Sequence, residues 1–115
     1  MPMYAVGMNV TDLQFAVLTA LAAERQHGYA LVKEAESQLG KVVPIATGYA
    51  CFEAMLSRGW MELDGEEVVQ GRTRRYYALS RAGADVLRER ADQLTARARV
   101  AHERLGASTG RPVTT

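Results

Sequence analysis

The chain has 115 residues, 48% of them hydrophobic, which suffices for one small domain with a packed core. Its formal net charge of +1 does not indicate a strongly basic nucleic-acid binder, although residues 81–115 carry seven Lys and Arg against four Asp and Glu. The single cysteine excludes a disulfide framework and a cysteine-rich zinc site and favours a reducing compartment, with the cytoplasm as the default.

Residues 1–10 are expected to form an N-terminal arm ahead of the domain. This arm has no basic residue before an apolar run, so we do not expect a signal peptide. The longest apolar stretches, around Phe15 to Ala23, are too short to span a bilayer, and no membrane partner is expected.

Two short helices are predicted next. The first follows a capping-box pattern formed by Thr11 and Gln14, and it should end near residues 24–26. The second starts after residues 27–28, where His27 is interpreted as a turn or helix-start residue. It should end at Gly40, a residue type suited to left-handed backbone.

A third helix is predicted from about Thr47 to Arg58, with Gly59 as its stop, and two strand-like runs then form a hairpin. The tip of this hairpin carries three arginines: Arg72, Arg74 and Arg75. In a winged helix-turn-helix the third helix enters the major groove while the hairpin, or wing, lies along phosphates. The sequence therefore predicts a winged helix-turn-helix DNA-binding domain over residues 11–80.

Ser80 is expected to cap a longer helix over residues 81–105, about 37 Å in length. Its small and apolar residues recur at alternating spacings of three and four, as in a coiled-coil seam. The helix either lies on its own domain or pairs with a second copy, and so long a stripe on so small a domain favours pairing. The predicted dimerisation residues are Leu87, Ala91, Leu94, Ala98, Ala101 and Leu105. Residues 106–115 have the composition of a flexible tail.

The expected fold is thus mainly α with a small β-hairpin, a winged helix-turn-helix followed by a long C-terminal dimerisation helix. The chain resembles the PadR family of transcriptional regulators over about residues 13–94, and in particular its short subfamily with a single C-terminal dimerisation helix. The resemblance is carried by residues 27–31, by Thr47, Tyr49, Phe52, Met55 and Gly59-Trp60, and by residues 71–83. It implies a homodimeric, usually repressing regulator that binds a double-stranded DNA operator and releases it on binding a small-molecule effector.

The chain departs from the family pattern in the third helix. Gly48 replaces an apolar anchor, and Ala50 and Glu53 replace basic residues. A glycine weakens a helix, and Glu53 would repel phosphate if it faced DNA. These departures support a rival function, a winged-helix protein-interaction module with weakened or lost DNA binding.

The candidate DNA contacts lie on the wing and at the start of the third helix. Guanidinium groups match phosphate geometry, and two copies of the three wing arginines with two copies of Lys41 predict that log K falls with log salt with a slope of about 5 to 7. The alternative for the three wing arginines is that they form a solvated hairpin tip without contacting DNA. Thr47 contacts DNA or is a plain N-cap, Tyr49 contacts DNA or covers the gap at Gly48, and Ala50 contacts a thymine methyl or only favours the helix.

Other chemistry is weakly indicated. Tyr4 and Phe15 are candidates for an effector pocket, with ordinary core packing as the alternative. Cys51 is interpreted as a small buried hydrophobe rather than a redox sensor. His27 and His102 have no partner at ligand spacing, and no catalytic set is evident, so no metal, cofactor or enzyme activity is expected.

Overall fold

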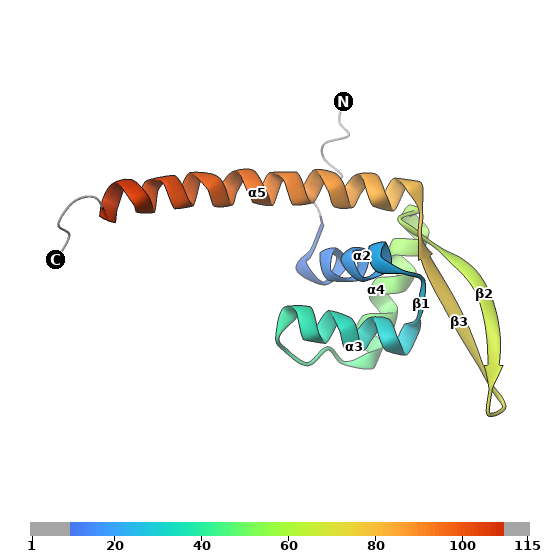
Figure 1. The fold of residues 1–115 in the computed structure, drawn as a ribbon. Helices are drawn as coiled ribbons and strands as arrows, with labels where there is room; N and C mark the ends of the chain where they lie inside the picture. Colours follow the sequence, from blue (N-terminus) through green and yellow to red (C-terminus); the bar gives the residue numbers. More distant parts are fainter. Residues whose placement is uncertain (1–9, 110–115) are drawn as a thin grey trace.

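The computed structural model describes residues 10–109 and has the predicted mainly α architecture. Three short helices pack under the first part of a long helix, and a hairpin projects from the same end of the molecule, away from that helix (Figure 1). In chain order the elements are α2 (Asp12–Ala23), β1 (Gln26–His27), α3 (Gly28–Leu39), α4 (Ile45–Arg58), β2 (Met61–Val69), β3 (Arg72–Leu79) and α5 (Arg81–Thr109).

Local capping fixes the first two helices as predicted. The backbone N–H of Gln14 donates to the Thr11 hydroxyl and that of Thr11 donates to the Gln14 amide oxygen, both at 3.0 Å, which completes the capping box. His27 caps α3, because its Nδ1 accepts from the backbone N–H of Ala30 at 3.4 Å. Gly40 ends α3 with a φ of 71°, in the left-handed region.

The start of α4 differs from the prediction. The helix begins at Ile45, and Pro44 occupies the N-cap position without a side-chain cap, so the interpretation of Thr47 as an N-cap is wrong. Proline suits this helix start because its fixed φ leads into helical backbone and its missing N–H is not needed there. Thr47 instead lies inside the first turn with its side chain exposed.

The close approach of α3 and α4 explains Gly48. A Cβ atom on Gly48 would lie 2.6 Å from Cγ2 of Val32, so a larger residue would push the helices apart. The interpretation of Tyr49 as a cover for the gap at Gly48 is therefore wrong, since Val32 fills that space. The Tyr49 ring lies over Gly28 instead, where a Cβ would be 2.8 Å from its Cζ.

The sheet has three antiparallel strands in the order β1-β3-β2, one more than the predicted hairpin. Gln26 pairs with Tyr77 and His27 with Tyr76, which attaches the wing to the segment between α2 and α3. A strand of two residues is too short to leave a periodic pattern in the sequence, so sequence reasoning missed it.

The core lies between the three short helices and the base of the wing. Leu18, Leu31, Phe52 and Met55 are almost fully buried, and Tyr77 of β3 joins them with a ring centroid 5.2 Å from that of Phe52. The wing is therefore anchored to α4 at its base.

The long helix α5 begins at a tight contact with the domain. Ser80 caps it, accepting from the backbone N–H of Gly83 at 3.0 Å and donating to the carbonyl of Gly59 at 2.5 Å. A Cβ on Gly83 would lie 2.8 Å from the carbonyl carbon of Trp60. The helix runs to Thr109, so the first four residues of the predicted tail are helical. No helix within residues 10–109 combines the length and the apolar character needed to cross a membrane.

Candidate nucleic-acid interface

A groove of about 860 Å³ separates the wing from the amino-terminal parts of α3 and α4. Tyr49 and Glu53 line it from α4, and Tyr29 lines it from α3. The opposite wall is the wing, with Arg72, Arg74 and Arg75. The structure thus brings together four of the seven predicted DNA contacts, namely the three arginines and Tyr49.

The remaining three predicted contacts lie outside this groove. Thr47 and Ala50 are exposed on α4, and Lys41 is exposed in the connection between α3 and α4. With Ala46, Glu53 and Ser57, the residues Thr47 and Ala50 give α4 an exposed row of small and polar side chains.

Two exposed apolar side chains near the start of α4 were missed by sequence reasoning. Val42 is 81% exposed and Ile45 is 48% exposed. The groove also contains Tyr29, which is 56% exposed and was not a candidate. A tyrosine after a helix-starting glycine resembles an ordinary amphipathic position, and only the packing of α3 against the wing shows that it faces the groove.

The wing carries its positive charge in a compensated form. In the β2–β3 register Arg74 lies opposite Glu67 and Arg75 opposite Glu66, whereas Arg72 lies opposite the apolar Val69. Opposite charges across a strand pair favour the hairpin and also weaken the field that its arginines project. Arg72 therefore has the least compensated charge of the three.

The other two arginines each have a neighbour at the base of the wing. Nη1 of Arg74 lies 3.5 Å from Nε2 of His27, which belongs to β1. Burial raises the pKa of the Tyr77 hydroxyl, and the neighbouring Arg75 guanidinium opposes that rise. Arg74 and Arg75 remain exposed, so their donors are accessible to an anion in the groove.

The predicted dimerisation residues divide into two groups along α5. Leu87, Ala91 and Leu94 are half-buried, and Leu87 packs against the core of its own domain. Ala98, Ala101 and Leu105 are exposed, in the part of α5 that extends beyond the other helices (Figure 1). Packing on its own domain thus accounts for the first part of the helix, and pairing with a second copy stays a prediction for the exposed part.

The structure shows no pocket or reactive group at the remaining candidate residues that it describes. Phe15 is half-buried against the core, and Tyr4 lies outside the described residues. Cys51 is buried with its Sγ 3.6 Å from Sδ of Met55, and burial raises the pKa of its thiol to about 11, which suits an inert core residue. Within residues 10–109 no three His, Cys, Asp or Glu side chains gather as metal ligands.

Three short helices followed by a wing and a groove between the two define a winged helix-turn-helix protein. Residues 17–89 match the sequence model of the transcriptional regulator PadR-like family. The chain therefore belongs to the PadR-like family of transcriptional regulators, as its sequence motifs indicated. A comparison with curated proteins found no match.

Solved structures share this fold. A PadR family transcription regulator from Clostridium difficile R20291 is 18% identical with a TM-score of 0.69, over 83% of this chain and 99% of that one. A transcriptional regulator from Thermoplasma acidophilum is 20% identical with a TM-score of 0.66, over 93% and 98%. A PadR family regulator from Eggerthella lenta is 26% identical with a TM-score of 0.62, over 77% and 80%.

Proposed function

We propose that this protein is a cytoplasmic transcriptional repressor that binds an operator sequence in double-stranded DNA as a homodimer. The observation that carries the proposal is the groove between α4 and the wing, because three exposed arginines and two exposed tyrosine rings face it. Guanidinium and phenol groups are donors suited to phosphate oxygens. A duplex lying against this surface would meet the wing and the start of α4 together.

In this arrangement the exposed face of α4 enters the major groove. Thr47, Tyr49 and Ala50 occupy the amino-terminal half of the helix, the end that meets base edges in helix-turn-helix proteins. Lys41 and the wing arginines contact phosphates on either side. The phosphate contacts supply affinity and register, and the helix supplies sequence preference.

The second copy of the chain pairs through α5. The supporting observation is the distal part of this helix, where Ala98, Ala101 and Leu105 leave an apolar stripe exposed. Two-fold pairing presents two α4 helices to a pseudo-palindromic site, with half-sites separated by about 34 Å, one helical turn.

Selection of bound fragments from random or genomic DNA at moderate salt tests DNA binding and yields the operator. We expect a pseudo-palindrome from the wild type and much weaker enrichment from a variant in which Arg72, Arg74 and Arg75 are replaced by alanine. Failure of the wild type to enrich any sequence would refute the proposal.

Sedimentation tests the homodimer separately. Leu105→Asp should convert the protein to a monomer because it places a charge in the apolar seam. Val100→Asp is the matched control, because Val100 is 46% exposed on the same helix but lies off the seam. A wild type that sediments as a monomer at micromolar concentration would contradict the pairing.

A second candidate is a winged-helix module that binds another protein. The observation that favours it is the acidic character of the interface, since Glu53 and Glu66 line the groove and Glu67 lies opposite Arg74. Carboxylates repel a phosphate backbone but accept hydrogen bonds from a basic protein partner. Lack of retention on any DNA by a dimeric wild type would favour this module.

An effector that releases the DNA completes the proposed mechanism. The sequence candidates for its pocket are Tyr4 and Phe15, and the half-burial of Phe15 against the core is also what ordinary packing requires. Screening small molecules for release of a bound operator fragment tests whether an effector exists.

A further inference from the structure

The strand β2 has an irregularity in its middle. The β2–β3 register shifts between Leu63 and Glu66, so Asp64 and Gly65 are not opposed by residues of β3 in the ladder. Gly65 has a φ of 99°, which a residue with a side chain adopts only under strain. A bulge of this kind bends its strand and removes partners from backbone groups. The direction of the wing beyond it therefore depends on what holds the bulge.

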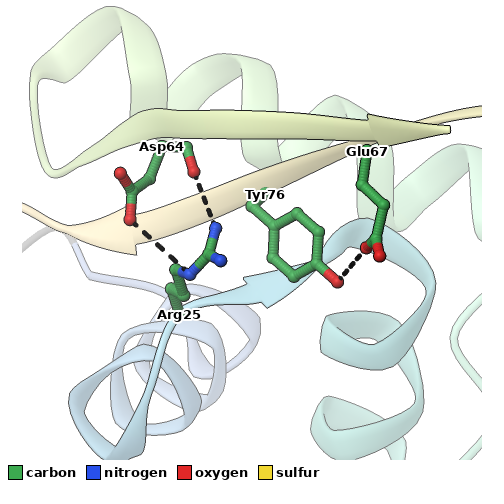
Figure 2. Close-up of polar contacts among 4 residues, drawn as sticks. All are labelled: Arg25, Asp64, Glu67 and Tyr76. Carbon is green, nitrogen blue, oxygen red and sulfur yellow. Dashed lines mark hydrogen bonds and ion pairs between the residues drawn. The ribbon is translucent and has the colours of Figure 1, made fainter.

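Arg25 holds it from outside the hairpin. Its Nη1 donates to the backbone carbonyl of Asp64 at 2.9 Å, and its Nε lies 3.9 Å from the Asp64 carboxylate (Figure 2). The same Nη1 lies 3.8 Å from the position of a Cβ on Gly65. The guanidinium thus supplies a partner for the bulge at the point where the ladder is interrupted, in ordinary contact distance of Gly65, where the backbone conformation favours glycine.

Arg25 also contacts the other strand of the wing. Its guanidinium carbon lies 4.3 Å from the centroid of the Tyr76 ring, a cation–π stack. The Tyr76 hydroxyl donates to the Glu67 carboxylate at 2.5 Å (Figure 2). This hydrogen bond links Tyr76 of β3 to the part of β2 that follows the bulge. One side chain therefore touches both strands of the wing.

The backbone at Arg25 is itself anchored to the domain. The residue follows α2 and directly precedes β1, whose two residues pair with β3. The wing beyond the bulge, from Glu66 to Arg75, is exposed apart from the half-buried Val69. Contacts at Arg25 are consequently well placed to decide how this exposed segment sits relative to α4.

We propose that Arg25 is a positioning residue: it fixes the direction of the distal wing and, through it, the affinity for DNA, without contacting DNA itself. The effect on affinity rests on the proposed DNA-binding function, whereas the effect on the wing does not. The rival role is a direct phosphate contact, since the Arg25 side chain is 52% exposed.

DNA affinity of paired variants separates the two roles. Arg25→Ala should weaken binding about tenfold, which corresponds to about 1.4 kcal/mol. Arg25→Lys should weaken binding nearly as much. Lysine keeps the charge but lacks the planar guanidinium group that stacks on Tyr76 and contacts both the carbonyl and the carboxylate of Asp64. Arg97→Ala, which removes an exposed arginine of α5, is the control for lost charge and should change affinity less than twofold.

The decisive comparison repeats Arg25→Ala in the protein that lacks the three wing arginines. A residue that acts through the wing should then change affinity less than twofold, because the contacts it positions are absent. A direct phosphate contact would instead retain its full tenfold effect in that background, and Arg25→Lys would bind like the wild type. Either result would overturn the proposal.

Hydrogen exchange of the free protein tests the effect on the wing without DNA. Arg25→Ala should speed exchange of the backbone amides of residues 66–75 at least fivefold and leave α2, α3 and the melting temperature unchanged. Unchanged exchange in the wing would refute the positioning role. If the wild type binds no DNA, the proposed function fails, and this measurement still decides whether Arg25 holds the wing.

Discussion

The salt dependence of DNA binding is the most direct measure of the proposed interface. Each protomer offers four exposed cations, Lys41 and the three wing arginines, so a dimer offers eight. Neutralising eight phosphates gives a slope of about −7 for log K against log salt, and loss of some contacts gives about −5. Between 50 and 200 mM salt the affinity should then fall about 10³- to 10⁴-fold.

Replacing Arg72, Arg74 and Arg75 with alanine leaves only the two copies of Lys41. The slope should drop to about −2, and the affinities of wild type and variant should converge as salt rises. Among single changes, Arg72→Ala should reduce the slope most, because Arg72 alone lies opposite an uncharged strand partner.

The acidic strand supplies the opposite perturbation. Glu66→Gln removes the carboxylate across from Arg75 and should strengthen binding at low salt by about 0.5 to 1 kcal/mol, with no gain at high salt. Fluorescence anisotropy of a labelled operator duplex at four salt concentrations measures all of these slopes. A wild-type slope shallower than about −2, or equal slopes for the wild type and the triple variant, would show that the wing does not contact the phosphates of the DNA.

Three further predictions concern the fold. Gly83→Ala should destabilise the protein by about 2 to 3 kcal/mol in urea denaturation, because the methyl group would collide with the Trp60 carbonyl; stability equal to wild type would show that α5 can shift freely. Cys51 should react with iodoacetamide at pH 8 about 100-fold more slowly in the folded protein than in urea, since burial raises its pKa to about 11; equal rates would contradict its burial. The pKa of Glu36 is lowered chiefly by the N–H of Val43, so its contribution to stability is present above its unfolded pKa and is lost as pH falls through the lower folded pKa. Glu36→Gln should therefore remove part of the fall in the urea midpoint as pH drops below 4.5, the ordinary pKa of the group, and an unchanged profile would refute the assignment.

The features that the sequence predicted well depend on interactions between near neighbours. The capping box joins Thr11 to a residue three positions away, and Gly40 and Gly59 end their helices through their own backbone conformation. Such signals are complete within a few residues, so they can be read without knowing the fold. The order of the elements then follows from their spacing.

The features that the sequence did not predict depend on distant partners. Arg25 and Asp64 are 39 residues apart, and nothing near Arg25 marks it as a wing contact. In the sequence Gly48 is a residue that weakens its helix, and only the structure shows that Val32 packs against it. Tyr49 resembled a cover for that glycine, although its ring lies on Gly28, which belongs to another helix. In each case the residue type was visible and its partner was not.

The charge balance of the wing connects these observations. Strand β2 carries four carboxylates and β3 three guanidinium groups, so the hairpin as a whole has no net positive charge with which to attract DNA from a distance. Its arginines can favour binding only if they reach phosphates while the carboxylates stay farther away. That condition depends on the direction of the wing rather than on its net charge. The proposed attachment at the bulge and the proposed two-fold repetition of the interface would therefore matter more here than in a strongly basic wing, where attraction survives a poor fit.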